Sequence, residues 1–195
     1  MPNTVSSKHI QELSHHQIEA LSENAVLSVG RLEKVKGFDL AVESASVLKE
    51  KGVIFHWYVI GEGSERMNLE RMIIERKLGQ HFTLLGLKEN PYPYIRKAKV
   101  FVQSSRYEGK SIAVDEAKIL AKPIVLTNFT TAKDQIKNLV NGLIVGMTPE
   151  EIAAGIEKYL KNAVFTEKII ANLQLQHYGR EHGIEVFYRL ISNAD

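Results

Sequence analysis

Residues 99–127 read KVFVQSSRYEGKSIAVDEAKILAKPIVLT, and this stretch indicates the fold. The apolar run 99–103 predicts a buried strand, 104–109 a polar loop, and 111–120 a helix that stops before a second strand at 123–127. Glu108 and Glu116, with seven residues between them, lie on the two sides of the loop-to-helix junction. In a parallel open sheet, ligands bind beyond the carboxyl ends of the strands. We therefore expect Glu108 at that edge, with Glu116 on the following helix facing the same crevice.

The same alternation of strand and helix runs through most of the chain. Further strands are expected at 25–29, 53–60, 82–85 and 143–145. Helices are expected at 38–49, 65–78 and 131–138, in a short helix that residues 90–94 open and that runs through 97, and from 149 through 191. Five or six strands separated by helices predict an α/β fold, with a Rossmann-like parallel sheet of about six strands and helices on both faces. Residues 1–24 are polar and indicate a linker or a loosely packed helix, which leaves 25–195 as the domain.

Composition excludes several classes of protein. The 195 residues, 44% of them apolar, suit one domain with its own core. The absence of cysteine removes disulfides and thiolate catalysis, and is compatible with a reducing cytoplasm, where we expect the protein. A net charge of +2, with basic and acidic residues interspersed, does not indicate a nucleic-acid partner. No HExxH sequence occurs, and we expect no metal site.

Two glycine-containing loops follow predicted strands. The loop Gly30–Gly37 holds three cations before a helix amino terminus, a position that favours anions, and Arg31 and Lys36 would add charge-assisted bonds to a phosphate. Taken alone, a solvated surface loop is the commoner meaning of such cations. The second loop, Gly61-Glu62-Gly63, has Arg66 at the third glycine position, so the dinucleotide fingerprint fails and an ordinary tight turn is favoured.

Together, the cationic loop and the glutamate pair indicate a kind of ligand. Both lie at the carboxyl ends of strands and face one crevice. A diphosphate flanked by two polyols would match both, because cations neutralise the diphosphate and carboxylates accept hydrogen bonds from hydroxyls. Hydrogen bonds to charged groups are worth about 1.5 to 3 kcal/mol each. A nucleotide sugar is such a ligand.

Five short blocks then resemble a known family. In order and spacing they are similar to the carboxyl-terminal, donor-binding half of retaining glycosyltransferases of family 4, also called group 1, which have the two-domain GT-B fold. The blocks are GRL at 30–32 with KG at 36–37, GEG at 61–63, LG at 85–86, EG at 108–109, and EA at 116–117. The resemblance covers about residues 24–190. Lys110 stands where many members have an apolar or aromatic residue, and Asn128–Thr131 replaces a glycine-rich turn, which leaves the subfamily and the donor sugar open.

The resemblance implies a role for each residue of the site. Arg31 and Lys36 would bind the donor diphosphate, Glu108 would meet the sugar hydroxyls, and these three would be the catalytic residues. Glu116 would bind the ribose. The full donor-binding set is Gly30, Arg31, Lys36, Leu87, Glu108, Gly109, Lys110, Ser111, Ile112 and Glu116, with the nucleobase near Leu87 and the backbone amides of 109–112 meeting sugar and phosphate. Retention is usually ascribed in this family to attack on the leaving-group face with a diphosphate oxygen as base, so no protein nucleophile and no metal are implied.

The resemblance also implies a partner domain. Residues 2–5 are similar to the segment that leaves the last strand of the family's amino-terminal, acceptor-binding domain. We therefore expect this chain to be the donor-binding half, inactive alone, of an enzyme that moves a hexosyl unit from a UDP or GDP sugar to an acceptor hydroxyl. Peripheral association of the full-length protein with the inner face of the membrane stays open.

Other interpretations of the same residues stay open too. Glu108 would be a capping or ion-pairing side chain and Glu116 an exposed carboxylate paired with Lys118 or Lys122, while Tyr92, Tyr94 and Tyr107 would be ordinary packing. The chain would then be a non-catalytic nucleotide-binding or scaffolding module, or half of a related nucleotide-sugar epimerase. An epimerase needs acid and base residues for proton transfer at the sugar, whereas cations with carboxylates suit a departing diphosphate, so transfer is favoured.

Overall fold

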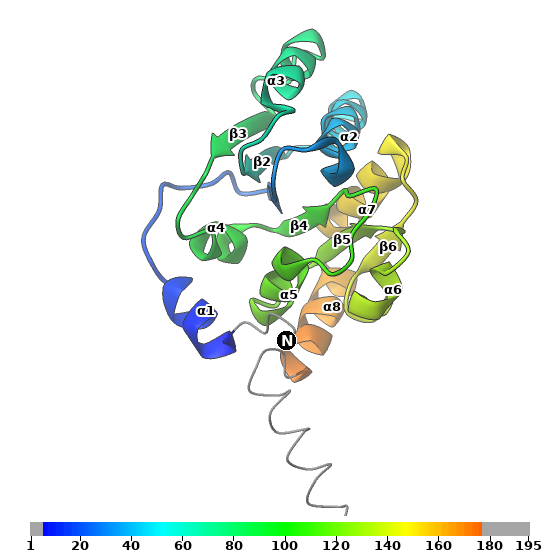
Figure 1. Cartoon of the computed structure of the whole chain (residues 1–195). Helices are drawn as coiled ribbons and strands as arrows, with labels where there is room; N and C mark the ends of the chain where they lie inside the picture. Colours follow the sequence, from blue (N-terminus) through cyan, green and yellow to red (C-terminus); the bar gives the residue numbers. More distant parts are fainter. Residues whose placement is uncertain (1–5, 177–195) are drawn as a thin grey trace, which may run out of the picture.

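Six strands form one parallel sheet in the computed structural model, which describes residues 6–176, and helices cover both faces of the sheet (Figure 1). The strands are β1 (Ala25–Val29), β2 (His56–Ile60), β3 (Phe82–Gly86), β4 (Val100–Gln103), β5 (Ile124–Thr127) and β6 (Leu143–Val145). The helices are α1 (Ser7–Leu13), the 3-10 turn η1 (Lys34–Lys36), α2 (Phe38–Glu50), α3 (Arg66–Glu75), α4 (Tyr92–Lys97), α5 (Ile112–Ile119), α6 (Ala132–Gln135), α7 (Pro149–Lys161) and α8 (Ala163–Leu175). The predicted Rossmann-like α/β fold is confirmed.

The strand order is β3-β2-β1-β4-β5-β6, and all neighbouring strands are parallel. The direction of winding therefore reverses between β1 and β4, which pair directly through Val26 with Val100 and Leu27 with Phe101. In open α/β sheets, the crevice outside the carboxyl ends at such a reversal is the usual ligand site. The loops after β1 and β4 are the two predicted polar loops.

Alternate residues of each strand enter two separate cores. Val26 packs with α2, α3, α7 and α8 on one face, whereas the next residue, Leu27, packs with α4, α5 and α6 on the other. Because both faces are buried, the strands are almost continuously apolar, as expected for a parallel sheet. The two cores hold the carboxyl edge of the sheet rigid, and this edge carries the polar loops.

Some elements are shorter than their apolar patterns predict. Strand β2 begins at His56 rather than at Val53, because Gly52 has a φ of +66° and the Val53 N–H still donates to the Leu48 carbonyl at the end of α2. Helix α3 ends at Glu75, since Lys77 takes a left-handed φ of 53°. Helix α6 has only four residues, because the backbone is extended at Ile136.

The segment before β1 contains a packed helix. Ser6 caps α1, Ile10 is completely buried, and the Asn90 side chain donates to the Leu13 carbonyl at 3.0 Å. Residues 7–13 therefore pack onto the domain beside α4 and α5. Residues 2–5, which resemble a segment leaving another domain, and the predicted helical tail through 191 beyond residue 176 lie outside the described part of the chain.

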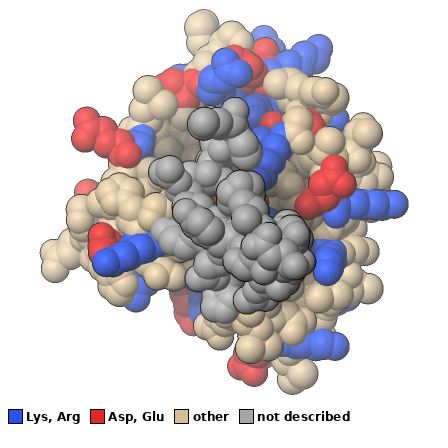
Figure 2. Space-filling model, turned by 60° about the horizontal axis from the view of Figure 1, so that its bottom comes forward, with Lys and Arg blue, Asp and Glu red and all other residues tan. Residues whose placement is uncertain are grey.

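The described surface mixes charges of both signs. On the face shown in Figure 2, Lys and Arg side chains are interspersed with Asp and Glu around the grey atoms. No helix within residues 6–176 is both long and apolar enough to cross a bilayer. The same residues contain no group of three or more His, Asp or Glu side chains suited to a metal ion.

Candidate functional site

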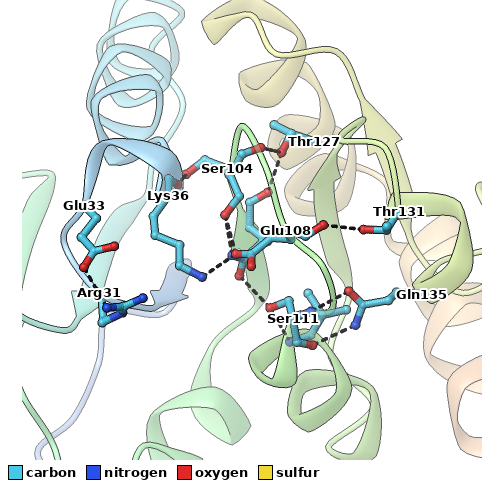
Figure 3. Close-up of polar contacts among 12 residues, drawn as sticks. Arg31, Glu33, Lys36, Ser104, Glu108, Ser111, Thr127, Thr131 and Gln135 are labelled. Atoms are coloured by element: carbon cyan, nitrogen blue, oxygen red, sulfur yellow. Dashed lines mark hydrogen bonds and ion pairs between the residues drawn. The ribbon is translucent and has the colours of Figure 1, made fainter. Parts of the chain in front are cut away.

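The loops after β1 and β4 lie against each other at the point where the sheet reverses (Figure 3). Gly37 makes this contact possible, because a Cβ there would come within 2.1 Å of the Ser104 carbonyl oxygen. The Ser104 hydroxyl donates to the Lys36 carbonyl at 3.2 Å, and the Arg106 N–H donates to the Val35 carbonyl at 2.8 Å. The cationic loop and the loop that carries Glu108 are therefore one connected structure.

Lys36 and Glu108 meet at the centre of this contact. The Lys36 Nζ lies 2.5 Å from the Glu108 Oε1, and the two side chains are only 20% and 10% exposed. Burial strengthens their attraction but also removes water that would otherwise solvate both charges. The structure thus brings together two of the residues predicted to act on a donor.

The Glu108 side chain is held through one oxygen. Its Oε1 also accepts hydrogen bonds from the Gln103 Nε2 at 2.9 Å and from the Ser105 hydroxyl at 2.8 Å. Within residues 6–176, no hydrogen bond reaches the Glu108 Oε2. Three donors therefore fix the carboxylate and leave Oε2 as the atom with capacity to accept a bond from a ligand hydroxyl.

Ser111 is the N-cap of helix α5 and stands at the end of the glutamate loop. Its hydroxyl accepts from the Val114 N–H at 3.4 Å, which is the usual role of a serine N-cap. The Gln135 Oε1 accepts from the Ser111 N–H at 2.9 Å, so this amide, predicted to meet sugar or phosphate, is already engaged. Ile112, the first residue of α5, is 40% exposed.

Lys110 points its charge at the helix rather than at Glu108. Its Nζ lies 2.9 Å from Asp115, which also pairs with Lys118 at 2.7 Å. Burial alone would raise the pKa of Asp115, but the hydrogen bonds and charges of Lys118 and Lys110 hold it below its ordinary value. Lys110 and Lys118 therefore share one carboxylate, and the Lys110 charge is directed at Asp115 of α5.

Glu116 is half-buried and bonded to a tyrosine. The Tyr92 hydroxyl donates to the Glu116 Oε1 at 3.1 Å. Burial raises the pKa of Glu116 even though this hydrogen bond opposes the shift. Burial and the nearby carboxylate raise the pKa of Tyr92 to about 12. Glu116 is thus not the exposed partner of Lys118 or Lys122, and Tyr92 is an orienting side chain as well as a packed one.

A small cavity lies beside the cationic loop. It has a volume of about 250 Å³, and its lining includes Gly30, Arg31, Gly61 and Leu87. Leu87 is 74% exposed, and the Arg31 side chain is 75% exposed and pairs with Glu33 at 2.9 Å. Larger hollows of about 490 and 400 Å³ lie beside α6 and at the amino ends of the strands, away from the Lys36–Glu108 pair.

The two glycines of the Gly61-Glu62-Gly63 turn allow a close approach of two backbone segments. A Cβ at Gly61 would come within 1.9 Å of the Gly30 carbonyl oxygen, and one at Gly63 within 2.4 Å of the Leu32 carbonyl oxygen. The two glycines therefore let the turn after β2 lie against the loop after β1. This agrees with their interpretation as a tight turn.

Several side chains that hold the site have no obvious signal in the sequence. They are Gln103 and Ser105 on the Glu108 carboxylate, Thr131 on the Glu108 carbonyl, Gln135 on Ser111, and Asp39 on Arg106. Among them, only Gln103 could have been found from the sequence, since it is a polar residue at the end of an apolar strand.

An open parallel sheet in the order 3-2-1-4-5-6, with a polar site at its reversal point, defines the class of Rossmann-like α/β domains. Within this class, the chain belongs to the family of glycosyl transferases group 1, whose model matches residues 10–176. The resemblance drawn from the sequence is confirmed.

Individual proteins similar to this chain are also named as sugar transferases. Poly(ribitol-phosphate) alpha-N-acetylglucosaminyltransferase of Staphylococcus aureus is 26% identical over 178 residues, which are 88% of this chain and 36% of that protein. Alpha-D-kanosaminyltransferase of Streptomyces kanamyceticus is 28% identical over 151 residues, which are 75% of this chain and 39% of the relative. One solved structure is similar as well, a crystal structure of a mutant of S. aureus TarM in complex with Fondaparinux, alpha-GlcNAc-glycerol and UDP. The match has a TM-score of 0.76 at 25% identity and covers 90% of this chain and 37% of the TarM chain. The chain thus spans little more than a third of the length of these relatives.

Proposed function

We propose that this chain is the donor-binding part of a retaining glycosyltransferase that moves a hexosyl unit from a nucleoside-diphosphate sugar to an acceptor hydroxyl. The observation that carries the proposal is the pair of Lys36 and Glu108, 2.5 Å apart at the reversal point of the sheet. A cation suited to phosphate and a carboxylate oxygen suited to a hydroxyl lie there within reach of one ligand. The UDP in the TarM complex supports a nucleoside diphosphate as part of the donor.

In this proposal, the site has two walls, the 30–37 loop and the 108–116 segment, and each wall binds one part of the donor. Lys36 and Arg31 bind the diphosphate, and the Glu108 Oε2 accepts a hydrogen bond from a sugar hydroxyl. The amides of Gly109, Lys110 and Ile112 face the sugar and phosphate. Glu116 accepts from the ribose, and the base, of the UDP or GDP type, occupies the cavity of about 250 Å³ beside Leu87.

The proposed chemistry uses the site to stabilise a leaving group. The bond between the anomeric carbon and the diphosphate oxygen breaks, and its electron pair leaves with the diphosphate. Lys36 and Arg31 stabilise the negative charge that develops there. The acceptor oxygen bonds to the anomeric carbon on the same face, and its proton passes to the departing phosphate oxygen. These two cations are the groups assigned to the diphosphate, and the proposal includes no metal ion.

The acceptor is the second substrate of the proposed transfer. We infer that residues outside this chain bind it, since transfer needs the acceptor oxygen about 3 to 3.5 Å from the anomeric carbon and the described site faces outward from one edge of the sheet. The chain alone should then bind the donor without transferring sugar. Slow hydrolysis of the donor is the most activity that we expect from it.

A thermal-shift screen tests the proposal. The chain is heated with UDP, GDP and ADP, with their glucose conjugates and with the matching nucleosides, because a ligand that binds only the folded state raises the apparent stability by mass action. We expect a shift with one base and little shift with the matching nucleoside. The Lys36→Ala variant should lose the shift. Absence of a shift with all of these ligands would favour a scaffolding module instead.

A further inference from the structure

Two side chains from the segment after β5 hold the loop that carries Glu108 (Figure 3). The Thr131 hydroxyl donates to the Glu108 carbonyl at 2.7 Å. The Gln135 Oε1 accepts from the Ser111 N–H at 2.9 Å, while its Nε2 donates to the Ser111 carbonyl at 2.8 Å. One side chain thus satisfies both backbone groups of one residue. Gln135 is only 6% exposed, so the contact is shielded from competing water.

The two contacts lie at the ends of a segment whose middle is not fixed by packing. Gly109 and Lys110, between the contact points, are not held by packing: Lys110 is exposed, and a Cβ at Gly109 would meet no atom within 4 Å. Packing therefore does not define the path of the backbone from 108 to 111. Polar contacts do, and among them the hydrogen bonds of Thr131 and Gln135 act on the backbone itself at the two ends of the segment, beside the side-chain contacts of Glu108 and the ion pair of Lys110 with Asp115.

Thr131 and Gln135 together form a clamp on the 108–111 segment, and the residues beside them are firmly packed. Phe129, Ala132 and Ile136 are at most 2% exposed and pack in the core that also holds α5. Ser111 in turn caps α5, the helix that carries Glu116. The clamp therefore fixes the loop that presents Glu108 and the start of the helix that presents Glu116, while it makes no bond to Lys36 or to the lining of the cavity beside Leu87.

We propose that Thr131 and Gln135 are positioning residues that shape the 108–111 segment for recognition of the donor sugar. The inference rests on the proposed donor site and deepens it. Because the clamp acts on the segment assigned to the sugar, its loss should weaken binding of a nucleotide sugar more than binding of the nucleoside diphosphate. A clamp with a merely structural role would change both affinities equally.

Calorimetric titration of variants separates these two roles. The ligands are the nucleoside diphosphate that wild type binds, chosen from UDP, GDP and ADP, and its glucose conjugate. For Gln135→Ala and Thr131→Val we expect about tenfold weaker binding of the sugar conjugate, with the diphosphate changed by less than about twofold. Thr131→Ser keeps the hydroxyl and should restore the affinity. Asn141→Ala is the matched control, because Asn141 is also buried and accepts from a backbone N–H, that of Lys137, outside the site. Equal losses for both ligands would overturn the positioning role.

Hydrogen exchange of the ligand-free chain tests the clamp without any donor. In wild type the Ser111 amide should be protected. In Gln135→Ala it should exchange about tenfold faster, while the Ile144 amide, bonded to Asn138 at 2.9 Å, stays unchanged. Unchanged exchange at Ser111 would overturn the clamp. A chain that binds none of the ligands yet shows this exchange pattern would refute the proposed function and leave the clamp as a structural contact alone.

Discussion

On one side of the site, three donors fix the Glu108 carboxylate and Thr131 fixes its backbone, whereas on the other side Arg31 is 75% exposed and pairs with the neighbouring Glu33. Lys36 joins the two sides, since it is largely buried and bonded to Glu108. The wall assigned to the sugar is therefore held in place by contacts within the chain itself. The wall assigned to the diphosphate has one fixed cation and one that is largely exposed to solvent.

The largest expected effect is on folding stability, from Glu108→Ala. The change leaves the Lys36 charge and two buried donors without their acceptor, so we expect a loss of about 3 kcal/mol in the free energy of unfolding. Urea unfolding followed by the fluorescence of the single tryptophan, Trp57, measures it. Glu75→Ala is the control, because Glu75 is 63% exposed and lies 3.9 Å from its partner Arg71. Equal losses in the two variants would show that the carboxylate wall is not held as described.

Lys36→Ala should have the next largest effect, on binding. We expect about 1.5 to 3 kcal/mol of binding free energy to be lost for a nucleoside diphosphate and much less for the nucleoside, because the change removes a charge-assisted bond to phosphate. Lys34→Ala, in the same loop but exposed, removes an equal charge and serves as control. Titration calorimetry with both ligands decides. Similar losses for nucleoside and diphosphate would mean that the loop is not a phosphate site.

Glu116→Gln should separate stability from binding. Burial raises the pKa of Glu116 above its ordinary value of 4.5, so the folded chain disfavours the ionised form. The protonated Glu116 carboxyl therefore contributes stability that is present below pH 4.5 and is lost as the pH rises through the raised pKa. Glu116→Gln should therefore be more stable than wild type above that window, yet bind nucleosides more weakly by about 1.5 to 3 kcal/mol, because it lacks a charged acceptor. Unchanged nucleoside affinity at neutral pH would show that Glu116 does not bind the ribose.

The smallest effect is expected from Asp39→Asn, which loosens the contact between the two walls. Arg106 bonds Asp39 at 2.7 and 2.6 Å, but the side chains are 36% and 31% exposed, so water screens the pair and we expect a loss of only about 0.5 to 1 kcal/mol. Burial alone would raise the pKa of Asp39, but Arg106 lowers it below 3.8. The contribution should hold above pH 3.8 and vanish as the pH falls through the lowered value, which acid unfolding of variant and wild type compares. A loss that persists at acid pH would contradict this.

Much of the fold could be predicted because each strand is a short apolar run between turn residues. The runs 25–29 and 143–145 match β1 and β6 completely. The run 53–60 overestimates β2, because apolarity alone does not distinguish the turn around Gly52 from the strand that follows. Helix α6 was overestimated for a similar reason, since Ile136 is buried but extended.

The charged residues of the site were predictable where each stands next to a glycine in a loop that follows a strand. Glu108 and Lys36 meet these conditions, and the structure brings them into contact. Thr131 and Gln135 do not, because their partners are set by which loops the sheet order places side by side. The engagement of the Ser111 amide by Gln135 likewise depends on a contact between segments 24 residues apart, which no periodicity encodes.

Calorimetric titration of the wild-type chain with UDP, GDP and ADP tests directly whether the Lys36–Glu108 site binds a nucleoside diphosphate. We expect saturable binding of one nucleoside diphosphate, weaker binding of its nucleoside, and loss of the difference in Lys36→Ala. A folded wild-type chain that binds none of the three diphosphates at millimolar concentration would contradict it.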